Sequence, residues 1–145
     1  MSSKVTGIED TIKALKAVGA SIEGKELQDV MRGEGRKVIA TAKSLVPADS
    51  GDLRDSIGFI TSKDDKFKSS VLIGTRRNYY NHYLGVMYEF GTAPRIQKNG
   101  RYTGTIEPRP FMRPALDKNK QSIVNGIFKG VSKIVSNLAK KYNLE

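Results

Sequence analysis

A helical pattern of apolar residues runs through the last third of the chain and largely determines its architecture. The pattern consists of Leu116, Ile123, Ile127, Val131, Ile134, Leu138 and Tyr142. Apolar residues three or four positions apart form one stripe on a helix, which must be buried against another element. We therefore expect one long C-terminal helix, and Pro114 suits its first turn.

Three prolines, Pro108, Pro110 and Pro114, lie just before or at the start of this helix. Proline lacks the backbone N–H that a central strand or a helix interior requires. We therefore expect residues 108–114 to form an extended entry to the helix.

Helical spacing also recurs in the N-terminal half. A short pattern precedes Gly19, which predicts a peripheral helix within residues 1–24 that ends at this glycine. A longer pattern begins near Lys25 and stops at Pro47. Gly33 and Gly35 lie inside it, where glycine costs about 1 kcal/mol relative to alanine. A local break, or a close contact with another backbone, is expected there.

The middle of the chain predicts a small sheet. Residues 47–52 are rich in turn formers, and residues 53–60 read as a strand. A charged turn over residues 61–66 and a second strand over residues 67–75 complete an antiparallel hairpin.

A short helix is expected over residues 78–90, followed by a mobile basic loop over residues 91–107 that is longer than the usual connection of about 4 to 6 residues. Residues 102–107 are expected to return as a strand. The whole chain, residues 1–145, then forms a single α+β domain. Its small antiparallel sheet packs against a long helix of the N-terminal half and the long C-terminal helix.

Charge is unevenly distributed along the chain. The formal net charge is +10, and residues 95–145 carry 11 basic but only 3 acidic groups. This asymmetry suits a polyanion or an acidic protein as partner, although solubility alone also explains many basic surfaces. Within the basic third, we expect contacts with DNA phosphates or an acidic partner from Arg95, Lys98, Arg101, Arg109 and Arg113.

Composition excludes several kinds of site. The chain contains no cysteine, so disulfides, thiolate zinc sites, iron–sulfur clusters and cysteine nucleophiles are excluded. The single histidine, His82, lies among tyrosines and is expected to pack or to face solvent. Asp49, Asp52 and Asp55 do not have calcium-loop spacing and are expected to cap turns. We expect no catalytic residue, cofactor or metal. No apolar run is long enough to cross a membrane, so we expect no membrane among the partners.

One further pattern interleaves cations and aromatic rings over residues 76–80, with Arg76, Arg77, Tyr79 and Tyr80. Proteins that bind single-stranded nucleic acids stack bases on such rings. Tyrosines at this spacing also commonly face a core or an interface, and both interpretations stay open.

Three ordered motifs carry a family resemblance. They are Pro47-x-Asp49-Ser50-Gly51-x-Leu53-Arg54-x-Ser56, then Tyr88-Glu89-Phe90-Gly91-Thr92, and then Pro110-Phe111-Met112-Arg113-Pro114-Ala115-Leu116. Together they resemble the phage tail-component family typified by gene product ten of phage HK ninety-seven. The resemblance covers about residues 25–135. Ser50 stands where the family commonly has threonine, and it keeps the capping hydroxyl.

The resemblance implies architectural roles for ten motif residues. These are Pro47, Ser50, Gly51, Leu53, Glu89, Gly91, Thr92, Pro110, Phe111 and Pro114. Glycine at positions 51 and 91 would form turns, and Phe111 would anchor the extended segment in the core.

The resemblance also implies a function. Members of the family are small, non-enzymatic subunits at the head–tail junction of long-tailed phages and prophages. This chain would then form a ring with copies of itself, contact other neck, connector and tail proteins, and allow double-stranded DNA to pass. It would reside in the host cytoplasm before assembly and in the virion afterwards. The alternatives are a tail terminator, a stand-alone nucleic-acid-binding protein, and a small hydrolase that uses Asp52 or Glu89.

Overall fold

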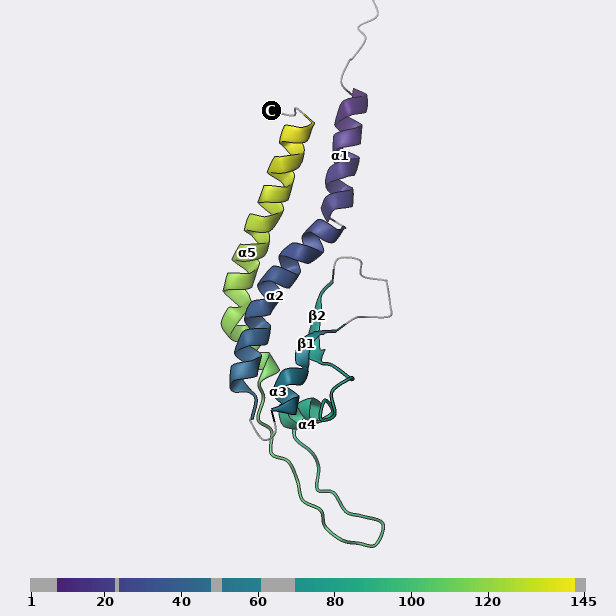
Figure 1. The fold of residues 1–145 in the computed structure, drawn as a ribbon, viewed down its shortest axis with the longest axis vertical. Coiled ribbons are helices and arrows are strands. Elements are labelled where there is room, and N and C mark those ends of the chain that lie inside the picture. The colour runs from purple at the N-terminus through teal and green to yellow at the C-terminus, as the bar shows by residue number, and fades with distance from the viewer. Residues whose placement is uncertain (1–7, 23, 48–50, 61–69, 143–145) are drawn as a thin grey trace, which may run out of the picture.

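A computed structural model describes residues 8–22, 24–47, 51–60 and 70–142 of the chain. Figure 1 shows an elongated molecule in which long helices lie beside a small sheet. The elements are, in chain order, α1 (Ile8–Ile22), α2 (Lys25–Leu45), α3 (Asp52–Ser56), β1 (Ile57–Ile60), β2 (Leu72–Thr75), α4 (Leu84–Phe90) and α5 (Met112–Lys141). The α+β class expected from the sequence is confirmed.

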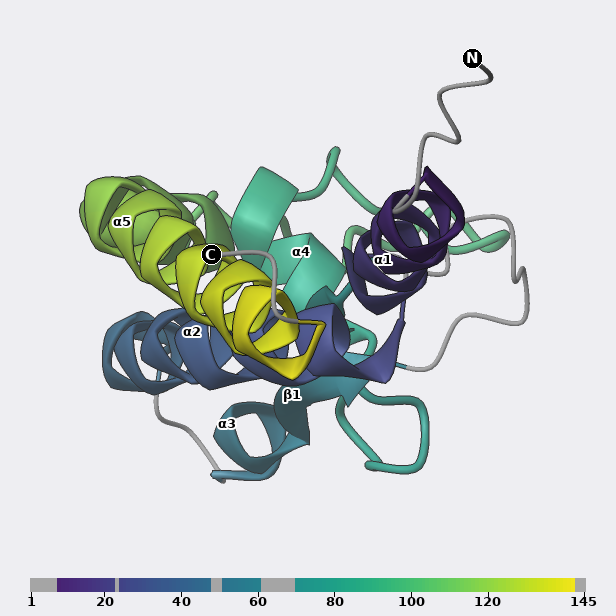
Figure 2. The ribbon, with the colours of Figure 1, turned by 90° about the horizontal axis from the view of Figure 1, so that it is seen from above.

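The scaffold is the antiparallel pair of α2 and α5, which lie side by side in Figures 1 and 2. The long C-terminal helix is confirmed, with Pro114 in its first turn. Gly126 and Gly130, one helical turn apart on α5, face α2. A Cβ atom at Gly130 would overlap the Val30 side chain, and one at Gly126 would overlap the end of Glu34. The two glycines therefore let the helices approach closely.

The sheet packs against α2 at a third glycine. Strands β1 and β2 pair antiparallel, with Phe59 opposite Ile73. A Cβ atom at Gly35 would lie 3.1 Å from Ile73 Cδ1 and 3.1 Å from Phe59 Cε1. The expected close contact is thus present at Gly35, but it is made by side chains and not by another backbone. The expected break is absent, because α2 continues through both glycines.

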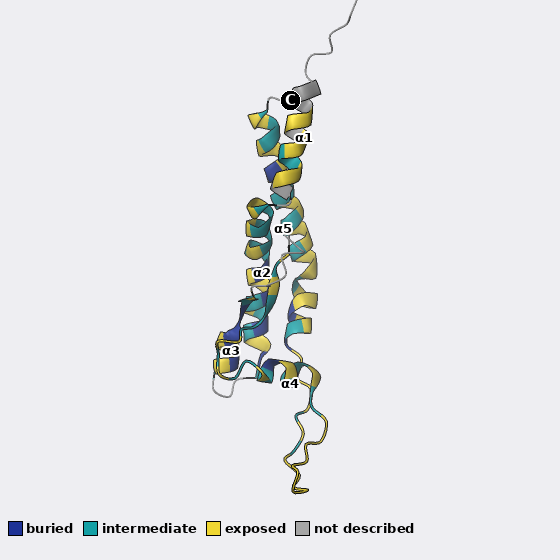
Figure 3. Cartoon of the chain, turned by 90° about the vertical axis from the view of Figure 1, so that its right-hand side faces the viewer, coloured by how far each residue is buried: buried dark blue, intermediate teal, exposed yellow. Residues whose placement is uncertain are grey.

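The core lies where the C-terminal half of α2, α3, β1 and the start of α5 meet. Its buried members are Val38, Ala42, Val46, Leu53, Ile57, Phe111 and Ala115. Phe111, the apolar anchor that the resemblance implies, is fully buried. Figure 3 shows these buried residues concentrated beside the sheet, whereas the upper helices are more exposed.

Helix α1 extends the molecule at the end near the C-terminus. The predicted end at Gly19 is wrong, because the helix continues to Ile22. One glycine inside a helix costs only about 1 kcal/mol, which a neighbouring helix can offset. Ile12 and Leu15 of α1 are exposed, so its apolar stripe is incompletely covered.

Three middle-segment predictions need correction. Residues 52–56 form the helix α3, and the first strand begins only at Ile57, because Gly51 adopts φ of +81° and starts a helical turn that buries Leu53. The helix expected from residue 78 begins at Leu84, after a series of turns. The return strand at residues 102–107 is reduced to one bridge, between Ile96 and Tyr102.

Candidate functional site

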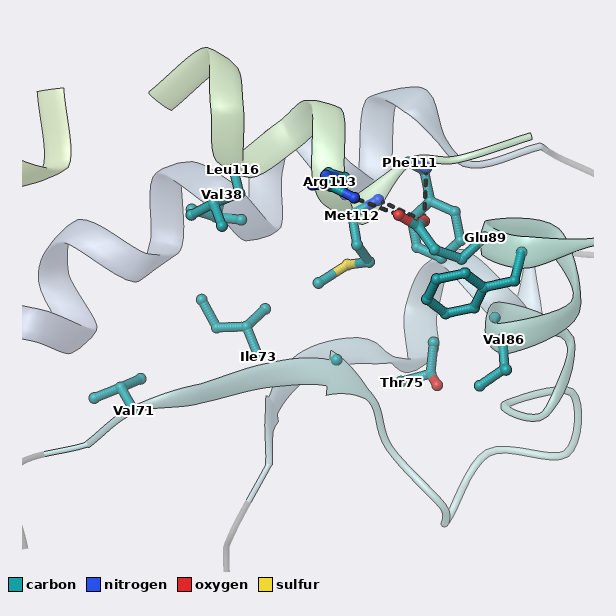
Figure 4. A pocket seen from close by; sticks show the side chains of 13 residues that line it. Val38, Val71, Ile73, Thr75, Val86, Glu89, Phe111, Met112, Arg113 and Leu116 are labelled. Atoms are coloured by element: carbon teal, nitrogen blue, oxygen red, sulfur yellow. Dashed lines mark hydrogen bonds between the residues drawn. The ribbon is translucent and has the colours of Figure 1, made fainter. Parts of the chain in front are cut away.

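Glu89, at the end of α4, binds the first turn of α5. Its Oε2 accepts hydrogen bonds from the backbone N–H groups of Phe111 and Met112 at 2.9 and 3.0 Å. Its Oε1 accepts one from the N–H of Arg113 at 3.0 Å. The first N–H groups of a helix have no partner within the helix and carry partial positive charge, so a carboxylate there is stabilising. Glu89 therefore caps α5 from a different helix, and Figure 4 shows the arrangement.

These bonds also determine the acidity of Glu89. Partial burial by itself raises the pKa of the carboxyl, whereas the three backbone N–H groups and the charge of Arg113 lower it, and the net shift is downward. Hydrogen bonds to the charged form favour ionisation. Glu89 is therefore an ionised cap at neutral pH, the protonation state opposite to that of a general acid.

The residues after Glu89 turn the chain into a protruding segment. Gly91 has φ of +74°, and a Cβ atom there would lie 2.9 Å from Pro108 Cδ. Thr92 then closes the base, since its N–H donates to the carbonyl of Ile106 and its Oγ1 accepts from the N–H of Ile106, both at 3.0 Å. Gly91, for which the resemblance implies a turn, thus has a backbone conformation that favours glycine.

We call residues 92–106 the arm. Its two sides run together, with hydrogen bonds from Arg95 N to Gly104 O and from Gln97 N to Arg101 O at 3.1 and 2.9 Å. Residues 93–103 are all exposed. Figures 1 and 3 show the arm pointing away from the helices, at the end of the molecule opposite the C-terminus. The mobility expected of residues 91–107 stays a prediction.

The five predicted basic contact residues do not form one cluster. Arg95, Lys98 and Arg101 are exposed on the arm. Arg109 and Arg113 are also exposed but lie at the junction with α5, where the N–H of Arg109 donates to the carbonyl of Tyr88 at 2.6 Å. The arm thus carries three cations without any core contact that would explain them.

An apolar groove of about 520 Å³ lies beside the arm's base, between β2, α4 and the start of α5. We call it the groove; its apolar lining includes Val71, Ile73, Val86, Phe90, Met112 and Leu116. Figure 4 shows Val71 and Ile73 on the β2 side facing Met112 and Leu116 on the α5 side. Pockets of this size and character are common binding sites.

Phe90, which lines the groove, has a largely exposed side chain that the fold itself does not use. Its neighbours Glu89, Gly91 and Thr92 each support the local fold, but the side chain of Phe90 is 76% exposed. The sequence analysis did not predict this surface. Leu84, Met87 and Tyr88 form one apolar face of α4, and Val86 and Phe90 form a second one. A helix that is apolar on two faces is typical of a buried or contact-forming helix.

Two residues of the cation–aromatic run at residues 76–80, Arg76 and Tyr79, contact each other and the rest of the fold. The guanidinium of Arg76 lies 4.7 Å from the ring centroid of Tyr79 and donates to the carbonyls of Asp55 and Ser56 at 2.8 and 3.2 Å. His82 is half-buried, with Nδ1 2.9 Å from the carbonyl oxygen of Tyr79. His82 is thus a packing residue, as expected. Tyr80 stays exposed.

The first motif joins the same region of the fold. Gly51 has positive φ just before α3, Pro47 is half-buried, and Leu53 lies in the core with Phe111. Asp49 and Ser50 lie outside the described residues. Asp52 accepts a hydrogen bond from Asn81 Nδ2 at 3.2 Å.

The described part of the chain has neither a cluster of metal ligands nor a helix that could span a membrane. Among residues 8–22, 24–47, 51–60 and 70–142, no group of three or more metal-ligating side chains was found. None of the helices in these ranges is both long and apolar enough to cross a membrane.

The chain was compared with protein-family models, with curated proteins and with solved structures, and nothing matched in any of the three comparisons. The family resemblance therefore rests on the three sequence motifs alone.

Proposed function

We propose that this chain is a head–tail joining or tail-completion subunit of a long-tailed phage or prophage. It acts by assembly and not by catalysis. The observation that supports the proposal best is the convergence of the three motifs. Glu89 of the second motif binds the backbone of Phe111, Met112 and Arg113 in the third, and Leu53 of the first shares their core. Leu53 and Phe111, 58 positions apart, thus belong to one building block, whose arm and groove are left for contacts with other molecules.

In this proposal the partners are identical subunits arranged in a ring, together with neck, connector and tail proteins of the same particle. Arg95, Lys98 and Arg101 on the exposed arm contact either the passing DNA or an acidic surface of a partner. The subunit resides in the host cytoplasm before assembly and at the head–tail junction afterwards. Neither a cofactor nor a membrane belongs to this mechanism.

Location in the particle tests the proposal and separates it from the alternative of a tail terminator. Gold-labelled antibody against the chain should bind purified virions at the junction between head and tail. Label on isolated tails that have never met a head would favour a terminator. Virions without the chain would contradict both functions.

A stand-alone nucleic-acid-binding protein is the second candidate, because three cations are exposed on the arm. Its affinity for duplex DNA should fall with salt, with a log–log slope near −0.9 for each phosphate neutralised. Charge reversal at Arg95 and Arg101 should flatten that slope, whereas reversal at Arg76 should instead destabilise the fold. Absence of binding at low salt would eliminate this candidate.

A hydrolase that uses Glu89 or Asp52 is the least supported alternative. Both oxygens of Glu89 are engaged by backbone N–H groups, which leaves little capacity for proton transfer. An activity of the purified protein that disappears in Glu89→Gln or Asp52→Asn, without loss of the fold, would revive it.

A further inference from the structure

The free edge of β2 is the starting point. The N–H of Arg76 donates to the carbonyl of Ser56 at 2.9 Å, and the register pairs Gly58 with Gly74. In an antiparallel ladder, hydrogen-bonded pairs alternate with unbonded ones. The backbone groups of Ile73 and Thr75 therefore point away from β1. Among the described residues, no backbone group pairs with this edge.

The groove lies over one face of β2, next to that free edge. Val71, Ile73 and Thr75 line it, and no residue of β1 does. A third strand would lie about 4.8 Å from β2, and its alternate side chains would point in the same direction as Ile73. These side chains would enter the groove between the sheet and α5. The groove therefore has the shape and the hydrogen-bonding edge that an added strand needs.

The arm has matching properties. The bonds from Thr103 N to Arg95 O and from Gln97 N to Arg101 O enclose the bridge between Ile96 and Tyr102. The backbone groups of these two residues consequently point outward, and their side chains share one face of the arm. Ile96 and Tyr102 are 67% and 59% exposed. The arm thus offers an unpaired strand edge together with two uncovered apolar side chains.

We propose that the arm of one copy adds to the β2 edge of a second copy and directs Ile96 and Tyr102 into its groove. In Figure 1 the arm extends away from β2 and α5 of its own chain, the elements whose residues line the groove, so we assign the contact to two different copies. Its sides of about seven residues span about 23 Å, enough to run along the whole of β2. Strand addition of this kind obtains affinity from the main chain and specificity from pockets for alternate side chains.

A second copy is the favoured occupant because every chain carries both one arm and one groove. The arm has exposed apolar side chains, and the groove has an uncovered apolar lining. The two surfaces differ, so the contact is head-to-tail and repeats from copy to copy until the ring closes. Closure of the contacts into a ring rests on the proposed function. The pairwise contact between arm and groove can be tested without a virion.

Cysteine cross-linking provides the direct test, because the chain has no cysteine of its own. One protein carries Ile96→Cys on the arm, and a second carries Phe90→Cys at the groove. Mixed and treated with a short bismaleimide, they should give a heterodimer as the main product. The control partner is Phe128→Cys on α5, which is 69% exposed and outside the groove. It should give only a trace of cross-linked product.

Charge variants provide an independent test. Ile96→Asp and Phe90→Asp should each remain monomeric in sedimentation, whereas Phe128→Asp should associate like the wild type. An equimolar mixture of Ile96→Asp and Phe90→Asp keeps one intact arm and one intact groove. It should form dimers and nothing larger, a result that a symmetric interface would not give.

The outcomes are distinct. Equal cross-linking of Ile96→Cys to positions 90 and 128, or none to position 90 at the highest soluble concentration, would overturn the inference. So would cross-links from position 90 to a region other than the arm, which would assign the groove to a different occupant. If arm and groove cross-link but the chain is missing from virions, the proposed function fails and this contact stands. The reverse result would leave the function intact and refute the contact.

Discussion

The carboxylate of Glu89 accepts a hydrogen bond from the backbone N–H of Met112, the first residue of α5, at 3.0 Å. The bond joins the end of one helix to the beginning of another across 23 positions of the chain. The arm leaves and re-enters the fold between these two residues. Glu89 therefore fixes the base of the arm as well as the start of α5, and the first predictions concern this residue.

Replacing Glu89 by alanine should lower the free energy of unfolding by about 1 to 2 kcal/mol, because a helix cap is lost and three N–H groups lose their partner. Urea denaturation would measure the change. Glu107→Ala is the matched control, since this exposed glutamate makes no hydrogen bond among the described residues, and its unfolding should be unchanged. Equal stability of the two variants would argue against the cap.

The contribution of Glu89 should depend on pH. The pKa of its carboxyl is lower in the folded protein than its usual value of about 4.3. A lowered pKa means that the ionised form stabilises the fold above the unfolded pKa, and that this stabilisation is lost as pH falls through the folded pKa. The stability difference between wild type and Glu89→Gln should therefore be constant from pH 7 to about 5 and shrink below about 4.3. A difference that grows on acidification would contradict this assignment.

Two glycines in the helix pair should respond oppositely to alanine. Gly130→Ala should destabilise by about 1 to 3 kcal/mol, because its Cβ would overlap the branched side chain of Val30. Gly33→Ala should instead stabilise by about 1 kcal/mol, since a Cβ there meets nothing within 4 Å and alanine favours the helix. Thermal unfolding of both variants would check the contrast. Similar shifts in the same direction would mean that α2 and α5 are not in close contact at Gly130.

The cost of a side chain at Gly91 has two sources, the backbone conformation and the close contact with Pro108. Gly91→Ala and Gly100→Ala both place a side chain at positive φ, +74° and +79°, and at Gly91 the ψ of −178° is a conformation that essentially only glycine adopts, which costs about 1 to 3 kcal/mol. Only Gly91 also meets Pro108 at 2.9 Å, whereas nothing lies within 4 Å of a Cβ at Gly100. Gly91→Ala should therefore be the more destabilising in chemical denaturation. Equal effects would show that neither the extended backbone at Gly91 nor the contact with Pro108 adds a cost.

The long helices were predictable because their apolar periodicity persists over many turns, which identifies α2 and α5 from local sequence. The five residues of α3 are too few for a period to appear, and the burial of Leu53 decides their conformation. The prediction of a return strand at residues 102–107 was wrong for a related reason. Apart from the single bridge at Tyr102, no strand within the described ranges pairs with residues 103–107.

The candidate site was predictable only in part. The basic residues of the arm could be named because charge is visible in the sequence. The cap made by Glu89 could not, since its partners are backbone N–H groups 22 to 24 positions away that no side-chain pattern reveals. The groove depends on where β2, α4 and α5 meet, which is a tertiary property. The second apolar face of α4, at Val86 and Phe90, was the signal available for it.

Deletion of the gene from an inducible phage or prophage tests the account most directly, with electron microscopy of the particles that it releases. An assembly subunit of the head–tail junction predicts separate DNA-filled heads and free tails, and recovery of joined particles when the wild-type chain is supplied. Complete, infectious virions made without the chain would contradict the account.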